Sequence, residues 1–359
     1  MGRSEAMSDR RVPVVAVTGF LGAGKTSLLN HLLRRPGARL GVVVNDFGAI
    51  NVDAALVGGQ VEQAAAITGG CLCCLPDAGG LDDALARLAR PRLRLDAILV
   101  EASGVADPLT VARLIRASRA RRVRPGGLIE VIDALEYFAT VDRWPQPPAR
   151  FAAATLVVIG KTDLLAPQER EETAVRIRAR VARRNPRVPV LIARRGGVDP
   201  ALIFDIAAAE DPADELPIAR LMREEHGDRH EHAQSVSLPL GAPVAPGPLV
   251  DLLEDPPEGV YRLKGRVRTR GPRAQHGWLV DTVGPQIHVA ALPAPPPAGE
   301  LVAVGAHLDR AEVRRRLLHV ARAAPDRADP AGMGRLRRHV RLSSGSGRPV
   351  SSELAHRED

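Results

Sequence analysis

Short, almost wholly apolar runs alternate with longer amphipathic stretches over the first 200 or so residues of the chain. Runs that are apolar on both faces are typical of strands buried in a parallel sheet, and the stretches between them suit the helices that connect such strands. The pattern predicts an α/β domain with a mostly parallel sheet flanked by helices. The expected strands are Val12–Val17, Leu40–Val44, Ala97–Val100, Leu128–Ile132, Leu156–Ile159 and Val188–Ile192, and the expected helices are Ser27–Arg34, Leu81–Leu88, Leu109–Ser118 and Pro167–Arg184.

The pattern changes after residue 211. Acids, Pro and His accumulate over residues 212–233, as in a linker, and shorter apolar runs over residues 234–323 predict a smaller C-terminal α+β domain. We expect residues 1–11 to be disordered, residues 12–211 to form the first domain, and residues 324–359 to form a flexible basic tail. The strands expected in the second domain are Ser235–Leu240, Val260–Val267, His276–Val283, Ile287–Ala291 and Leu301–Val304, and its helices are Leu249–Leu253 and Asp309–Val320.

Composition excludes some classes of function. The net charge is +8, but basic residues are spread along the chain and aromatic residues make up only 3%, which argues against a nucleic-acid-binding protein that stacks bases. No apolar run approaches the roughly 20 residues of a membrane span. The polar start of the chain has no apolar leader, so we expect a cytoplasmic protein.

A glycine-rich turn lies between the first expected strand and the first expected helix. Residues 19–26 read G-F-L-G-A-G-K-T and match the phosphate-binding P-loop G-x-x-x-x-G-K-[ST] in its usual context. Its backbone amides and the start of the helix favour phosphate, Lys25 would reach the β- and γ-phosphates, and Thr26 would offer a hydroxyl to Mg²⁺. The residues expected to line the nucleotide are Gly19, Gly22, Ala23, Gly24, Lys25, Thr26 and Ser27.

A second motif is the acidic end of a buried strand, in the sequence Ile98-Leu-Val-Glu101-Ala-Ser-Gly104. Ligands of open α/β sheets bind at this edge. Glu101 would act on Mg²⁺ through its water shell or orient the attacking water, and the amide of Gly104 could sense the γ-phosphate. We therefore expect Lys25, Thr26 and Glu101 to carry nucleotide hydrolysis.

A third motif, Gly160-Lys161-Thr-Asp163, resembles the guanine motif N-K-x-D with Gly in place of Asn. The Asp163 carboxylate would accept hydrogen bonds from guanine N1–H and N2–H₂, which adenine cannot supply, and the Lys161 stem would pack on the ring. Gly160 lacks the side-chain amide of the usual Asn, which normally braces this loop, and its absence would weaken guanine selectivity. In the loop that begins at Ala193, a backbone N–H could contact guanine O6.

The three cysteines of the chain are Cys71, Cys73 and Cys74. This clustering excludes a disulfide framework and indicates metal binding, because thiolates at such spacing suit Zn²⁺, Cu⁺ and similar ions. Three ligands leave a tetrahedral ion one ligand short. Such an open position favours metal transfer over a permanent structural site.

The order of these motifs resembles the CobW-like GTPases, relatives of the urease and hydrogenase nickel-insertion GTPases. The resemblance is carried by residues 19–26, 69–74, 101–104 and 160–163, and it extends to Val260-Tyr-Arg-Leu-Lys264-Gly and Gly305-Ala-His-Leu-Asp309 near the C-terminus. It implies a GTP-driven metallochaperone with Mg²⁺ as catalytic cofactor. It also implies Zn²⁺ or Co²⁺ as cargo for a metalloprotein client.

Further metal ligands are expected at two places, one from the resemblance and one from the clustering of histidines. Asn45-Asp46-Phe47-Gly48 matches the switch segment of the family, commonly N-E-F-G, which makes Asp46 the expected carboxylate partner of the thiolates or of Mg²⁺. In the linker, His226, His230 and His232 could gather Zn²⁺, Co²⁺ or Ni²⁺, the alternative being a solvated linker without a metal role.

Three other charged residues receive structural interpretations. Asp107 and Asp133 match family positions and are expected to cap a helix or fix a loop. Lys264, one of only three lysines, is expected to be a surface residue.

The leading hypothesis is a GTPase in which GTP orders Asp46 and the cysteine loop into a metal site that hydrolysis loosens. The alternatives are a nucleotide-gated metal store or sensor with little catalysis, a small-molecule kinase or ligase, and a nucleic-acid-binding GTPase. The sequence leaves open the metal, the client and whether the chain forms a homo-oligomer.

Overall fold

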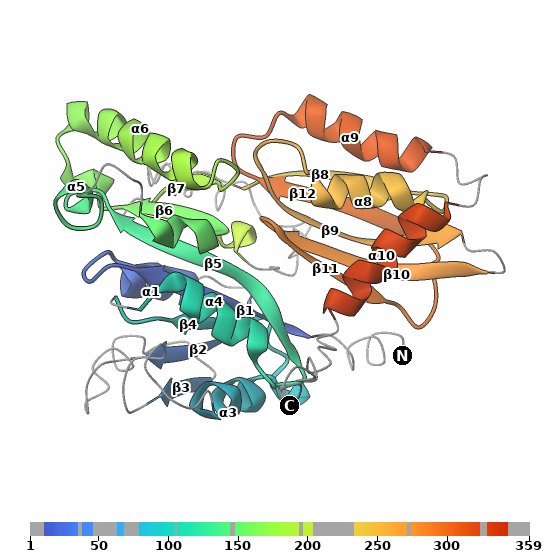
Figure 1. The fold of residues 1–359 in the computed structure, drawn as a ribbon, viewed down its shortest axis with the longest axis horizontal. Helices are drawn as coiled ribbons and strands as arrows, with labels where there is room; N and C mark the ends of the chain where they lie inside the picture. Colours follow the sequence, from blue (N-terminus) through green and yellow to red (C-terminus); the bar gives the residue numbers. More distant parts are fainter. Residues whose placement is uncertain are drawn as a thin grey trace, which may run out of the picture.

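A computed structural model describes residues 11–34, 38–45, 63–67, 79–104, 106–143, 148–193, 197–203, 233–270, 274–323 and 329–343. The ribbon contains two sheets, each with its own helices (Figure 1). The first sheet has seven parallel strands in the order β3-β2-β4-β1-β5-β6-β7. These strands are β1 (Val12–Gly19), β2 (Leu40–Asn45), β3 (Gln63–Ile67), β4 (Ala97–Glu101), β5 (Val123–Asp133), β6 (Leu156–Gly160) and β7 (Val190–Ile192).

Helices cover both faces of this sheet. The helices of this domain are α1 (Lys25–Leu33), α3 (Gly79–Leu88), α4 (Pro108–Ala117), α5 (Tyr137–Thr140) and α6 (Pro167–Arg184). Helices α3, α4 and α6 bury their apolar sides against one face, whereas α1 packs against the other. In α6, apolar Ala174, Ile177 and Val181 recur at helical spacing and are fully buried.

The second sheet has five antiparallel strands in the order β11-β10-β9-β12-β8. Its core is shared with three helices, which Figure 1 shows grouped around the sheet. The elements are β8 (Gln234–Leu240), α8 (Pro246–Glu254), β9 (Val260–Arg270), β10 (Gln275–Val283), β11 (Gln286–Ala291), β12 (Gly299–Gly305), α9 (Arg310–Arg322) and α10 (Pro330–Ser343).

The two parts of the fold share a hydrophobic core. Tyr261, Val283 and Val304 of the second sheet pack in the same cluster as α1 and the α1 side of the parallel sheet. The Tyr261 hydroxyl lies 3.3 Å from Thr155 Oγ1, at the start of β6. The second domain therefore completes the cover of the face on which α1 lies.

The expected α/β domain with its smaller α+β domain is confirmed, and each expected strand and helix is present with ends shifted by a few residues. Strand β3 was not expected. The prediction of a flexible tail over residues 324–359 is wrong for Pro330–Ser343, which form α10. Residues 1–10, most of the linker and residues 344–359 lie outside the described residues.

Candidate functional site

The P-loop connects β1 to α1 at the carboxyl edge of the parallel sheet. Gly22 and Gly24 have φ of +75° and +98°, in the left-handed region that glycine adopts without strain. A Cβ atom at either position would meet no heavy atom within 4 Å, so open space lies over the loop. The Ala23 amide donates to the Phe20 carbonyl at 3.1 Å and closes the turn. The loop therefore has the shape of a phosphate cradle at a helix N-terminus.

Lys25 begins helix α1 with its side chain folded back into the loop. Its ammonium group donates to the carbonyls of Gly19 at 3.1 Å and Phe20 at 3.3 Å, and the residue is only 8% exposed. The charge expected to meet the phosphates thus lies within the cradle. A compact ammonium suits this enclosed position better than a planar guanidinium would.

Thr26 and Glu101 meet beside the P-loop although 75 residues separate them. Strands β1 and β4 are adjacent and parallel, so their carboxyl ends lie together. The Thr26 hydroxyl donates to Glu101 Oε1 at 3.0 Å, and Glu101 is 5% exposed. A hydroxyl and a carboxylate oxygen are hard donors that fit Mg²⁺, which binds few protein oxygens together with phosphates and waters.

The loop after β4 lies against the P-loop. A Cβ atom at Gly104 would lie 2.6 Å from the amide nitrogen of Leu21, so only glycine permits this approach. Farther along, Asp107 caps α4 by accepting from the amide and the hydroxyl of Thr110. This confirms Asp107 as a capping residue, and the close approach of Gly104 to the P-loop is compatible with the prediction that its amide senses the γ-phosphate.

The predicted base motif follows β6. Lys161 adopts a left-handed backbone with φ of 61°, and its ammonium lies 2.7 Å from Asp133 Oδ2 at the end of β5. The other Asp133 oxygen accepts from the Leu135 amide, which confirms Asp133 as a residue that fixes a loop. Gly160 lies beside the P-loop, because a Cβ atom there would lie 3.6 Å from the Ala23 carbonyl. The base motif and the phosphate cradle are therefore neighbours.

Two further predictions at the base site have different outcomes. Asp163 lies half-buried in the short 3₁₀ helix Thr162–Leu164, directly after Lys161. The Ala193 amide donates to the Ile159 carbonyl at 2.8 Å, so it is part of the sheet. The Ala193 amide is therefore not the N–H of this loop that could contact guanine O6, and because residues 194–196 lie outside the described residues, the predicted contact from the loop stays a prediction.

Apart from Thr26, which was predicted to bind Mg²⁺, the predicted metal ligands lie outside the described residues. These are Asp46, Cys71, Cys73, Cys74, His226, His230 and His232. In the described part of the chain, no group of three or more His, Cys, Asp or Glu side chains could hold a metal ion. The described helices also include none that is long and apolar enough to cross a membrane.

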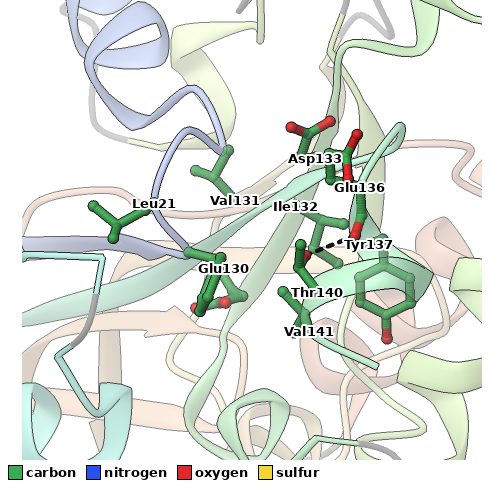
Figure 2. A pocket seen from close by; sticks show the side chains of 10 residues that line it. Leu21, Glu130, Val131, Ile132, Asp133, Glu136, Tyr137, Thr140 and Val141 are labelled. Carbon is green, nitrogen blue, oxygen red and sulfur yellow. Dashed lines mark hydrogen bonds between the residues drawn. The ribbon is translucent and has the colours of Figure 1, made fainter. Parts of the chain in front are cut away.

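One polar cluster behind the P-loop was missed by the sequence analysis. Glu130 on β5 accepts a hydrogen bond from the Thr18 hydroxyl and forms an ion pair with Arg150. The signal was a single acid within the otherwise apolar strand Leu128–Ile132. Figure 2 shows Glu130 and the P-loop residue Leu21 on the walls of one small pocket of about 90 Å³.

Two family models match the chain. Residues 13–191 match the CobW/HypB/UreG nucleotide-binding domain, and residues 233–321 match the cobalamin synthesis protein CobW C-terminal domain. The chain belongs to the CobW/HypB/UreG family. The first match covers nearly all of the parallel sheet, and the second covers the antiparallel sheet with α8 and α9. Helix α10 lies beyond the second match.

Curated relatives in this family include proteins named for zinc. The zinc chaperone YjiA of Escherichia coli is 31% identical over 202 residues, which are 54% of this chain and 61% of YjiA. The zinc chaperone CobW of Sinorhizobium sp is 27% identical over 348 residues, 85% of this chain and 96% of that protein. The zinc-regulated GTPase metalloprotein activator 1 of Schizosaccharomyces pombe is 34% identical over 164 residues, 43% of this chain and 40% of that protein.

A solved structure of the same family also aligns with this chain. The crystal structure of Zn(II)-bound YjiA GTPase from E. coli has 20% sequence identity and a TM-score of 0.40, and the alignment covers 87% of this chain and 99% of that one.

Proposed function

We propose that this CobW/HypB/UreG family member is a GTP-hydrolysing metallochaperone that binds Zn²⁺, with Co²⁺ as the alternative cargo, and delivers it to a metalloprotein client. The observation that carries the nucleotide half is the meeting of Thr26 and Glu101 beside the P-loop, at 3.0 Å. The zinc half is supported by relatives named zinc chaperones. It is also supported by the Cys-x-Cys-Cys sequence at residues 71–74.

Different residues of the site would bind the phosphates, Mg²⁺ and the base. The amides of the P-loop and the Lys25 ammonium neutralise phosphate charge, which is the main source of rate in phosphoryl transfer. Thr26 would hold Mg²⁺. Glu101, next to it, would accept hydrogen bonds from the waters bound to the metal or orient the attacking water. Mg²⁺, when bound, adds charge neutralisation at the phosphate oxygens. Lys161 and Asp163 would recognise guanine.

The cargo would bind at Cys71, Cys73 and Cys74, with Asp46 as a further ligand. These residues lie in sequence between the P-loop and Glu101, the two parts of the nucleotide site. The linker residues His226, His230 and His232 would collect ions for the thiolates. Segments that contact the γ-phosphate change order on its loss, which is the physical basis for coupling metal affinity to nucleotide state.

The nucleotide half is tested by Lys25→Ala, which removes the charge that meets the phosphates. We expect GTP binding or hydrolysis to be abolished, measured by phosphate release and by nucleotide affinity. The matched control is Lys264→Ala, which removes another of the three lysines, on β9 in the second sheet. Unchanged turnover in Lys25→Ala would contradict the P-loop assignment.

The metal half is tested by measuring Zn²⁺ and Co²⁺ affinity under reducing conditions by chelator competition. The protein is loaded either with GDP or with a non-hydrolysable GTP analogue and Mg²⁺. We expect the affinity to rise at least tenfold in the GTP form, a coupling of about 1.4 kcal/mol. A variant with all three cysteines changed to serine should lose the site. Equal affinities in both forms would instead favour the metal store or sensor.

A further inference from the structure

A buried ion pair lies directly behind the P-loop. Glu130 is 1% exposed, and its side chain forms an ion pair with Arg150 from the 3₁₀ helix Ala149–Ala153. The Thr18 hydroxyl lies 2.6 Å from Glu130 Oε2, within hydrogen-bond distance, and 3.1 Å from the Ile129 carbonyl. Glu130 therefore connects the strand before the P-loop to the segment that leads into β6.

The surroundings of this pair are apolar. Leu128 and Ile132, which flank Glu130 on the same face of β5, belong to the core cluster that also contains Tyr137 and Phe151. Burial raises the pKa of Glu130, against the opposing effects of Arg150 and Thr18. A buried ion pair adds little net stability compared with apolar residues of similar size, so stability alone does not account for it.

The pair reaches the phosphate cradle through one residue. Strands β1 and β5 place Thr18 opposite Glu130 and Gly19 opposite Val131. Gly19 is the first residue of the P-loop, and its carbonyl accepts from the Lys25 ammonium at 3.1 Å. The charges of Glu130 and Lys25 are also close enough to interact.

The start of the loop packs closely on β5. A Cβ atom at Gly19 would lie 2.5 Å from the Val131 carbonyl, so the loop already begins in close contact with this strand. Backbone pairing with β5 holds Thr18 and Gly19 in the sheet, and the bond from the Thr18 side chain to Glu130 adds a side-chain constraint next to the loop. The P-loop residues Phe20 and Leu21 line the same pocket as Glu130. Figure 2 shows Leu21 and Glu130 on its walls.

We propose that Glu130 is a positioning residue for the P-loop: with Arg150 as its counter-ion, it holds Thr18, and through Thr18 it sets the position of Gly19 and of the Lys25 ammonium. The kinetic consequences of this inference rest on the proposed GTPase function. Its structural consequence is that the P-loop is more rigid without nucleotide, and this does not depend on the proposed function.

Thr18→Val is the first test, because it keeps the shape of the side chain and the ion pair while removing the hydroxyl. We expect kcat for GTP to fall by about tenfold with KM changed less than threefold, since misplacing a group that stabilises the transition state slows chemistry more than binding. Thr18→Ser keeps the hydroxyl and should retain wild-type kcat. Wild-type kcat in Thr18→Val would overturn the proposal.

Glu130→Gln alone leaves Arg150 buried without its counter-ion, which could prevent folding. The double variant Glu130→Gln/Arg150→Gln replaces both charges by amides and should fold with the same loss of kcat as Thr18→Val. The matched control is Asp142→Asn, which changes another buried ion pair on the same face: Asp142 pairs with Arg180, with Nε at 2.6 Å. Asp142→Asn should lower stability but keep kcat where the protein is folded, and an equal loss of kcat would overturn the proposal.

Hydrogen exchange of the amides of residues 19–25, measured without nucleotide, tests the inference independently of GTP hydrolysis. Thr18→Val and the double variant should exchange faster than wild type in this segment, whereas Thr18→Ser and Asp142→Asn should not. If the wild-type chain hydrolyses no GTP, the proposed function fails and this readout still decides the positioning role. Wild-type exchange in Thr18→Val would overturn it.

Discussion

At the scale of single residues, Gly160 is the position where the base motif departs from N-K-x-D. Its backbone needs no positive φ, and a Cβ atom there would make only ordinary contacts at 3.6 and 3.7 Å. We therefore expect Gly160→Asn to fold without strain and to supply the amide that braces this loop. One added hydrogen bond of about 0.5–1.5 kcal/mol should raise the preference for GTP over ATP by about twofold to tenfold, measured by competition.

Gly160→Ala is the control, since it adds the Cβ atom without the amide. It should leave nucleotide preference unchanged and could stabilise the protein by about 0.4–1 kcal/mol through the unfolded state. A lower GTP affinity in Gly160→Asn with normal affinity in Gly160→Ala would contradict the assignment of residues 160–163 to the base.

The P-loop could be predicted because its chemistry depends on residues that are adjacent in sequence. Thr26 and Glu101 were both expected to act at Mg²⁺, and the structure brings them together because parallel strands place their carboxyl ends at one edge. The predicted contact with guanine O6 concerned a backbone N–H of the loop that begins at Ala193, and which amides of that loop are used by the sheet depends on how far β7 pairs with β6. The side chains of these residues do not indicate how far the two strands pair.

At the scale of whole elements, α10 offers a test of how the second domain is completed. Leu336 is fully buried in the core shared with α8 and α9, whereas Leu342 on the same helix is 68% exposed. Leu336→Ala should lower the free energy of unfolding by about 2–5 kcal/mol. Leu342→Ala should change it by at most about 0.5 kcal/mol, and equal effects in denaturant titrations would show that α10 does not contribute to the core.

Two of the elements that sequence reasoning missed, α10 and β3, were missed for different reasons. Helix α10 carries Met333, Leu336 and Val340 at helical spacing, but arginines and glycines surround them and weaken the apolar signal. Strand β3, of sequence Gln-Ala-Ala-Ala-Ile, has no aromatic residue and only one β-branched residue, Ile67, so its sequence carries little of the pattern that marks strands. Its conformation depends on pairing with β2 at the edge of the sheet. The local sequence does not show pairing between strands that are distant in the chain.

At the scale of the whole molecule, an ion cluster fixes the two domains to each other through β5. Asp281 of β10 accepts from Arg262 Nε at 3.1 Å and pairs with Arg124 near the start of β5. Burial raises the pKa of Asp281, but the charges of the two arginines outweigh this effect and hold it below the usual value. The same strand ends at Asp133, next to Lys161. Strand β5 thus extends from the domain interface to the nucleotide site.

Removing the anion of this cluster should weaken the domain interface. Asp281→Asn leaves two buried guanidinium groups without their counter-ion, so we expect the free energy of unfolding to fall by about 3–5 kcal/mol and the domains to unfold in separate transitions. Because the folded-state pKa of Asp281 is lowered, its contribution is complete above pH about 4, the ordinary pKa of Asp, and is lost as the pH falls through the folded-state value. The stability difference between wild type and Asp281→Asn should therefore shrink in acid.

The exposed pair between Arg187 and Asp255 also joins the two domains, at 3.5 Å, and provides the comparison. Arg187→Ala should lower the free energy of unfolding by at most about 1 kcal/mol, because water and salt screen exposed charges. Urea titrations of both variants at neutral pH and near pH 3 would separate the two cases. If Asp281→Asn costs no more than Arg187→Ala, the shared hydrophobic core around Tyr261 holds the domains together without help from the buried charges.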